Sequence, residues 1–365
     1  MNNLLLKPIG FTLFLTALLS SLWHQKVTAA TVVLYHHVSE STPKSTSVSP
    51  EQFEAHLTMI EELGLEVVPL TTIVNAIKLQ QPVNKNWIAI TFDDGFRNVY
   101  DTAFPMLKQR DWPFTVFVNP LMVKPSKLYM DWSQLKTLTE HGVDIMNHTL
   151  EHENLVQDGL SLQQIETNLL VAEEMIKEQL GQSHKMLAYP FGEYSDQIKG
   201  VLNKLGFVGF AQHSGSVGNN SDLLALTRFP ANGIYANPKT LKAKLKSLAF
   251  DIESQTPTET LVSNIVNIPE QQGPLWQVKL ANKDFYQSQL ACFITGQSGA
   301  VKPTWKSELE FEIAAPKTLQ TGRVKYNCTA PSINNSGRFY WMSKLWITLP
   351  EDMATNVKSK YETEN

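Results

Sequence analysis

The sequence has few cysteines and no excess of basic residues. Its 365 residues include two cysteines, Cys292 and Cys328, which allow one intramolecular disulfide at most. The formal net charge is −4, with no basic patch and no run of like charges, which argues against nucleic-acid binding and against a charged interaction tail. Internal repeats and low-complexity segments are also missing. The composition, 42% hydrophobic and 18% charged, excludes extensive disorder and is ordinary for a globular protein.

The N-terminus has the pattern of an export signal. Lys7 precedes an apolar run over 9–23, and the small residues of 27–29 offer a cleavage site. The run is shorter than the ~20 residues of a spanning helix. We therefore predict a signal peptide over 1–29 and a secreted or periplasmic protein. The alternative is an uncleaved anchor, which would be the chain's one membrane contact, and no cysteine follows the run for a lipid anchor.

Export places both cysteines in an oxidising compartment. A single structural disulfide between Cys292 and Cys328 is then the favoured interpretation. Two buried free thiols are the alternative.

The first two thirds of the chain alternate strands with helices. The expected helices begin at Pro50, at Trp132 and after the cap residues Ser161 and Ser195, and each ends at a glycine. This order predicts an α/β fold with a parallel sheet, open or closed into a barrel. The expected strands are short and apolar, and cover 32–35, 87–92, 114–118, 143–146, 186–189 and 207–211.

The pattern changes after about residue 250. The segment 254–258 is interpreted as a linker, and the short strand-like runs beyond it predict a small β-sandwich. We expect domains over 30–250 and 260–350. The expected strands of the second domain are 275–280, 289–294, 309–313, 323–328 and 338–349. Four aromatic residues near its end fit core packing better than sugar binding: Phe339, Tyr340, Trp341 and Trp346.

Two adjacent carboxylates, Asp93 and Asp94, follow the expected strand 87–92 and precede Gly95. Neighbouring side chains of an extended chain point in opposite directions, so one acid can bind a metal while the other faces the reacting group. Asp-Asp-Gly is also good turn chemistry, and taken alone the segment fits a polar turn equally well.

Two histidines, His148 and His152, follow the expected strand 143–146. Imidazoles four residues apart share one face if the chain turns helical, and this spacing suits two nitrogens on one metal ion. A pair of exposed loop histidines is the alternative.

A third segment, 189–192, again ends an apolar strand. Pro190 fixes a turn and Gly192 permits close approach, so a backbone N–H there can bind a developing oxyanion. Alone, it fits an ordinary strand-terminating turn. Function gathers at the carboxyl ends of parallel strands, and one aspartate with two histidines leaves a metal position open for catalysis.

These segments carry a family resemblance. Residues 91–95, 148–152 and 189–192 resemble the first three motifs of the polysaccharide deacetylase family, the NodB-homology group of carbohydrate esterase family 4. The opening segment 33–39 is similar to the branch that handles poly-N-acetylglucosamine. The resemblance covers about 31–235. It implies a distorted barrel of seven strands, followed here by the β-rich accessory domain, and a hydrolase that removes N-acetyl groups.

The resemblance also implies roles by matching position. Asp93 is the general base that activates water, and Asp94, His148 and His152 hold one divalent metal ion. The backbone N–H of Phe191 is the oxyanion donor. Two histidines and one aspartate suit zinc, while cobalt, nickel and iron accept such ligands as well.

Two positions depart from the family pattern. Many members carry an arginine that orients the base where this chain has Ala188, and the late Leu-x-His motif of the general acid is not found. His36 and His213 are the candidate acids, and each also fits a structural histidine. Tyr189 and Pro190 are expected to line the substrate site.

Two further positions favour structural roles. Asp131 is expected to cap the helix that Trp132 begins, in preference to a sugar-stacking role for the tryptophan. Arg228 resembles a recurring late position of the branch and is expected mainly to form a structural pair.

The expected partner is an N-acetylated polysaccharide, and the chain is expected to be a monomer. The polymer is left open between a biofilm glucosamine polymer, peptidoglycan and chitin. A polysaccharide O-acetyl esterase and an inactive carbohydrate-binding protein are the alternatives, although a binding module has no need of Asp93.

Overall fold

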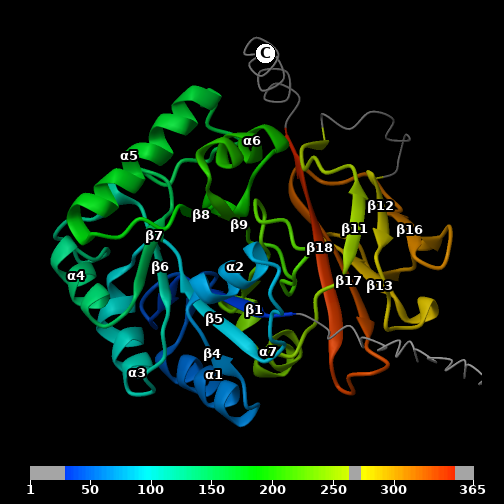
Figure 1. Ribbon diagram of the computed structural model, residues 1–365, viewed down its shortest axis with the longest axis horizontal. Helices are drawn as coiled ribbons and strands as arrows, with labels where there is room; N and C mark the ends of the chain where they lie inside the picture. The colour runs from blue at the N-terminus through cyan, green and yellow to red at the C-terminus, as the bar shows by residue number, and fades with distance from the viewer. Residues whose placement is uncertain (1–28, 263–272, 350–365) are drawn as a thin grey trace, which may run out of the picture.

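The computed structural model describes residues 29–262 and 273–349 (Figure 1). Its larger part is a curled parallel sheet with the order β10-β1-β5-β6-β7-β8-β9, and β4 pairs with β5. This confirms the predicted distorted (β/α) barrel. The strands are β1 (Thr31–Tyr35), β4 (Glu66–Val67), β5 (Trp87–Phe92), β6 (Thr115–Val118), β7 (Asp144–Asn147), β8 (Met186–Ala188), β9 (Val208–Phe210) and β10 (Phe229–Pro230).

Helices cover the outside of this sheet (Figure 1). Ser49, Asp131 and Ser161 each form a capping box at a helix start, because the side chain accepts from the third helical N–H. Asp131 is thus the predicted cap. Gly181 and Gly206 end their helices in the left-handed conformation. The helices are α1 (Pro50–Glu62), α2 (Leu70–Lys78), α3 (Phe104–Lys108), α4 (Trp132–Glu140), α5 (Leu162–Leu180), α6 (Asp196–Leu205) and α7 (Pro238–Leu245).

The sheet is buried on both faces, which explains why its strands are continuously apolar. In β1, Val33 and Tyr35 belong to one cluster of buried side chains, and Val32 belongs to another. Alternate residues of a strand point to opposite faces, and helices contribute to both clusters: α1, α3, α4 and α7 to the first, and α2 to the second. Polar side chains therefore gather at the strand ends.

The C-terminal part consists of two antiparallel sheets, as predicted. Their orders are β11-β12-β16-β15 and β14-β13-β17-β18, and Trp276, Phe311 and Tyr326 are buried between them. The longer strands are β11 (Ile252–Thr256), β12 (Leu275–Leu280), β13 (Ala291–Ile294), β16 (Glu310–Ala314), β17 (Gly322–Pro331) and β18 (Phe339–Thr348). The short edge strands are β14 (Ala300–Val301) and β15 (Thr304–Trp305).

The interpretation of 254–258 as a linker is wrong for its first half. β11 pairs along β12 as an edge strand, although most of its side chains are exposed and polar. Its backbone hydrogen bonds hold it in the sheet, and these leave no apolar signal in the sequence. The domain limits of 30–250 and 260–350 stay a prediction.

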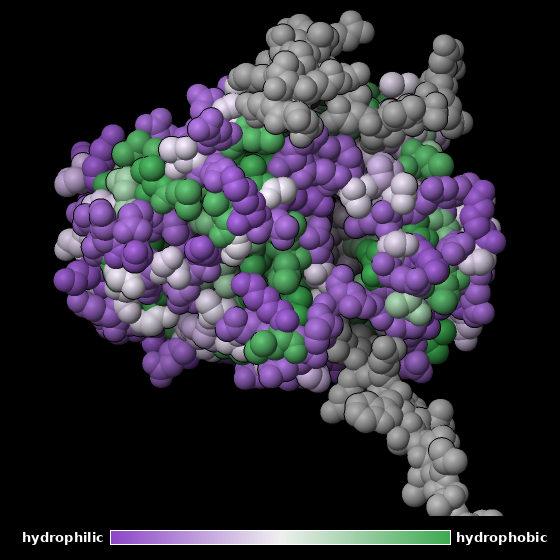
Figure 2. Space-filling model, turned by 45° about the horizontal axis from the view of Figure 1, so that its top comes forward, coloured by the Kyte–Doolittle hydropathy of each residue, from purple (hydrophilic) through white to green (hydrophobic). Residues whose placement is uncertain are grey.

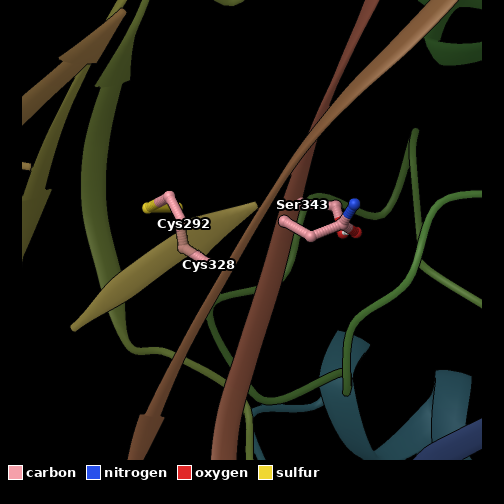
Figure 3. Close-up of a disulfide and its surroundings, with 4 residues drawn as sticks. Cys292, Cys328 and Ser343 are labelled. Carbon is pink, nitrogen blue, oxygen red and sulfur yellow. Dashed lines mark hydrogen bonds between the residues drawn. A yellow bond between two sulfur atoms is a disulfide. The ribbon is translucent and has the colours of Figure 1, made fainter. Parts of the chain in front are cut away.

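Cys292 and Cys328 form a disulfide across β13 and β17, where the two residues are direct register partners (Figure 3). Tyr340 and Trp346 are buried, which agrees with the core role favoured for these aromatics, whereas Phe339 is 40% exposed and does not fit it. The predicted signal peptide over 1–29 lies outside the described residues except for Ala29. Within the part of the chain that the structure describes, none of the helices has the length and apolar character needed to span a membrane.

Candidate metal centre and active site

The two acids follow β5 in a tight turn. Asp93 is fully buried, and its backbone N–H donates to the carbonyl of Tyr35 at 3.0 Å. Asp94 and Gly95 both have positive φ, 71° and 68°. The two acids have different partners, because Asp93 pairs with Arg228 whereas Asp94 lies next to His148 and His152, as expected for two acids with different tasks.

Backbone strain concentrates in the three sequence segments. Among the described residues, seven that are not glycine have positive φ, and four of them lie here: Asp94, Thr149, His152 and Phe191. Such conformations cost about 1–3 kcal/mol each and gather at functional sites. The histidines were expected on one helical face, but the structure has irregular backbone there, and the turns at Thr149 and His152 bring the rings together.

Asp94, His148 and His152 form a compact group. Their nearest side-chain atoms all lie within 4.8 Å of one another. The Nε2 atoms of His148 and His152 are 3.1 and 3.3 Å from Oδ1 of Asp94. The structure thus brings together the three residues predicted to bind a metal.

The donor chemistry of this group fits a cation. Nδ1 of His148 donates to the carbonyl of Ala188 at 2.7 Å, so the neutral ring presents the lone pair of Nε2 toward Asp94. Neither this Nε2 nor Oδ1 of Asp94 has a hydrogen-bond partner, although both atoms are buried. Two acceptors facing each other need a positive ion between them, and one carboxylate with two imidazoles suits a divalent transition metal.

Arg228 pairs with Asp93 inside the barrel. Its Nη1 and Nη2 donate to the two carboxylate oxygens at 2.7 and 2.8 Å, and both side chains are fully buried. Nε of Arg228 donates to the carbonyl of Ala211 at 3.0 Å, which fixes the guanidinium plane. Burial raises the pKa of Asp93, but the charge and hydrogen bonds of Arg228, together with the charges of His148 and His36, outweigh burial, and the net effect is a pKa below the ordinary value.

Arg228 is the functional residue that sequence reasoning undervalued. Many family members have an arginine that orients the base at the position of Ala188, the last residue of β8. In this chain Arg228, which directly precedes β10, contacts the base instead. The available signal was a lone arginine inside the apolar segment 226–230, combined with the missing partner at 188.

The turn after β8 carries the candidate oxyanion donor. Phe191 has a φ of 60°, and its ring lies 4.7 Å from that of His152, measured between centroids. Gly192 is required here, because a Cβ at this position would lie 2.5 Å from the backbone nitrogen of Gln212.

His36 lies beside the two acids, at the end of β1. Nδ2 of Asn232 lies 2.9 Å from its Nδ1 and donates to it, so the neutral ring carries its proton on Nε2. Burial lowers the pKa of His36, while the charges of Asp94 and Asp93 act in the opposite direction. Of the two candidate acids, His36 is thus the one that the structure places at the site.

His213 lies elsewhere. Its ring is buried 6.0 Å from that of Tyr194 and lines a cavity of about 360 Å³ between the barrel and the C-terminal sheets. Figure 2 shows the surface hollowed where these two parts meet.

Tyr189 and Pro190, expected to line the substrate site, are buried, and the Tyr189 hydroxyl donates to the carbonyl of Leu224 at 2.8 Å. Their contacts are therefore with the core.

A curled parallel sheet with an acid–histidine group at the carboxyl ends of its strands is typical of a hydrolytic enzyme. Residues 80–210 match the family model described as Polysaccharide deacetylase. This region is thus a polysaccharide deacetylase domain, which the sequence motifs predicted.

Relatives agree with this assignment, and solved structures share the fold. The chain is 25% identical over 201 residues to a poly-beta-1,6-N-acetyl-D-glucosamine N-deacetylase of Staphylococcus aureus (strain MRSA252), covering 52% of this chain and 69% of the relative. The fold is similar to that of Streptococcus pyogenes deacetylase PplD in complex with acetate, with a TM-score of 0.55 at 23% identity over 60% of this chain and 98% of the other. IcaB from Ammonifex degensii gives the same TM-score and identity, over 60% and 97%.

Proposed function

We propose that this protein is a metal-dependent N-deacetylase of an N-acetylglucosamine polymer, with poly-β-1,6-N-acetyl-D-glucosamine as the first candidate. The observation that carries this proposal is the buried, arginine-paired Asp93 next to the group of Asp94, His148 and His152. The polymer is suggested by the Staphylococcus aureus relative. We also infer export through a signal peptide over 1–29 and action as a monomer.

The residues divide into a metal-holding set and a proton-transfer set. A divalent metal, with zinc as the first candidate, held by Asp94, His148 and His152 would polarise the acetyl carbonyl and acidify a water molecule. Asp93 is ionised at neutral pH because Arg228 lowers its pKa, so it accepts a proton from the attacking water. Arg228 keeps both oxygens of the base in a fixed orientation.

Two further groups act on the developing charges. The backbone N–H of Phe191 donates to the oxyanion, a contribution of about 3–4 kcal/mol for one well-placed donor. The Nε2–H of His36 donates a hydrogen bond to the leaving sugar nitrogen, and the proton that Asp93 accepted from the water passes to this nitrogen. The C–N bond breaks, acetate leaves, and the amine that remains on the sugar gains positive charge at neutral pH.

Release of acetate from a panel of defined glycans tests the proposal. We expect acetate and an equal amount of free amine from N-acetylglucosamine oligomers, most from the β-1,6-linked ones, and none with the His148→Ala variant. Chitin oligomers and peptidoglycan fragments are tested in parallel, because preferential acetate release from one of them would identify that polymer as the substrate. Acetate from acetylxylan alone would assign the chain as an O-acetyl esterase. Glycan binding without acetate release in the metal-loaded protein would identify a binding module.

A further inference from the structure

The strand β17 has two faces with different partners. Val324, Tyr326 and Cys328 point into the core of the C-terminal sheets, whereas Arg323 and Lys325 alternate with them on the other face. Figure 3 shows the same division, because the disulfide lies on one side of β17 and β18 and Ser343 of β18 points to the other. The Ser343 hydroxyl donates to the carbonyl of Ser214 in the barrel part. The second face of these strands therefore meets the barrel.

Arg323 contacts the turn that follows β8. Its Nη1 donates to the carbonyl of Phe191, and its Nε lies 3.4 Å from Oε1 of Glu193. The guanidinium thus binds both sides of the turn that carries the Phe191 N–H. A carbonyl held by a cation fixes the peptide planes next to it, including the one that carries the Phe191 N–H.

Glu193 extends this contact to the segment after His152. Its carboxylate is 96% shielded from solvent, and its Oε2 accepts from Nδ2 of Asn154 at 2.9 Å and from Nε2 of Gln157 at 2.6 Å. The carboxylate therefore joins Arg323 on one side to the His152 segment on the other. A buried carboxylate in such a network loses much of its stabilisation when its cation is removed.

Lys325 acts on the same turn through Gln212, which packs against it. Its Nζ donates to the carbonyl of Gln212 at 2.6 Å. The backbone nitrogen of Gln212 lies 2.5 Å from the position that a Cβ on Gly192 would take. Lys325 therefore keeps Gln212 packed against the glycine, and Arg323 and Lys325 act on neighbouring points of one turn.

We propose that β17 of the C-terminal sheets is a positioning element of the active site, in which Arg323, aided by Lys325, holds the Phe191 turn and the His152 segment in their working geometry. This inference rests on the proposed deacetylase function. It assigns the C-terminal part a role in the chemical step on any substrate, including a short oligomer that cannot reach a distant binding surface. Arg323 is a positioning residue here, because it acts through Phe191 and Glu193.

Arg338 offers a matched control. It also joins the C-terminal part to the barrel, through the carbonyl of Lys85 at 2.8 Å and Oδ1 of Asn86 at 2.6 Å, but these residues precede β5 at the opposite end of the strand from Asp93. Arg323→Met and Arg338→Met each remove one arginine that bridges the two parts. Only the first removes contacts to the site.

The test uses the full-length, metal-loaded protein and a short N-acetylglucosamine oligomer. We expect Arg323→Met to lower kcat about 10- to 100-fold with KM nearly unchanged, since a small misplacement of catalytic groups costs that much. Arg323→Lys, which keeps the charge, should recover part of the loss. Arg338→Met should keep the wild-type kcat. Melting temperatures of the two methionine variants show whether both remain folded.

A second readout does not depend on activity. Hydrogen exchange of the amides in 189–194 and 152–157 should become faster in Arg323→Met and stay at the wild-type rate in Arg338→Met. Wild-type kcat and exchange in Arg323→Met would overturn the inference, and so would equal losses in both variants. A rise in KM alone would reassign Arg323 to substrate binding. An inactive wild-type protein would instead refute the proposed function, while the exchange rates still test the positioning role.

Discussion

Arg228 and Asp93 form a bidentate ion pair that is fully buried, with Nη1–Oδ1 and Nη2–Oδ2 distances of 2.7 and 2.8 Å. The two residues are 135 positions apart in the chain and meet because β10 and β5 both flank β1. The guanidinium also lies over the ring of Phe117, 5.3 Å from its centroid. The pair thus couples the closure of the sheet to the ionisation and orientation of the proposed base.

Replacing Arg228 with methionine should damage both activity and stability. An uncompensated buried Asp93 carboxylate is expected to lower the free energy of unfolding by about 3–5 kcal/mol. The pKa of Asp93 should also rise, because the largest opposition to burial is removed, and turnover should fall by about 100-fold or more. Urea denaturation and acetate release measure the two effects.

The double variant Arg228→Met with Asp93→Asn separates charge from packing. It should be more stable than Arg228→Met alone, because no unpaired charge remains, yet it should be inactive. Asp93→Asn alone should keep bound metal and lose turnover. Equal stability of the single Arg228→Met variant and the wild type would contradict the importance of the pair.

Removing His148 should remove the metal. His148→Ala deletes one of the three ligands, and we expect loss of both stoichiometric metal and activity. Metal analysis of the purified protein by mass spectrometry makes the measurement. His184→Ala is the matched control, because Nε2 of His184 also lies near a carboxylate, 3.5 Å from Oδ1 of Asp144, but outside this group. Full metal content in His148→Ala would refute the assigned ligands.

The sequence predicted the helices and strands of the molecule better than its long-range contacts. Caps such as Ser161 and Asp131 and terminal glycines such as Gly181 act locally, so their helices were predictable from neighbouring residues. The grouping of Asp94, His148 and His152 was predictable because these residues follow the apolar strands β5 and β7. The pairing of Arg228 with Asp93 depends instead on how the sheet curls, which no local pattern contains.

The same distinction applies to the C-terminal part. Alternating apolar residues predicted β17, but the partners of Arg323 and Lys325 depend on how two parts of the chain pack together. The edge strand β11 was missed because its side chains are exposed and only its backbone bonds define it.

The two candidate general acids differ in how a variant should respond to the leaving group. His36→Asn should slow amide hydrolysis by about 100-fold or more, since the sugar nitrogen must be protonated as it leaves. Hydrolysis of an activated aryl acetate should change little, because a phenolate leaves without a proton. His213→Gln, altered in a separate cavity, should change neither rate. Equal loss on both substrates in His36→Asn would indicate a role other than proton donation.

His213 should make stability depend on pH even though it lies away from the site. Burial, with the nearby charges of Lys325 and Lys344, lowers the pKa of His213 to about 3. Between about pH 6.5 and pH 3 the unfolded chain therefore binds a proton at this residue that the folded protein does not, so stability falls as the pH falls through this window. At pH 5 the loss from this one residue is about 2 kcal/mol relative to pH 7.5.

His213→Gln should remove that part of the pH dependence. Urea denaturation at pH 7.5 and pH 5 should show a loss of stability that is smaller by about 2 kcal/mol in the variant than in the wild type. The same loss in His213→Gln as in the wild type would mean that the imidazole takes up its proton in the folded protein. The cavity between the barrel and the C-terminal sheets would then have to accommodate a positive charge next to Lys325 and Lys344.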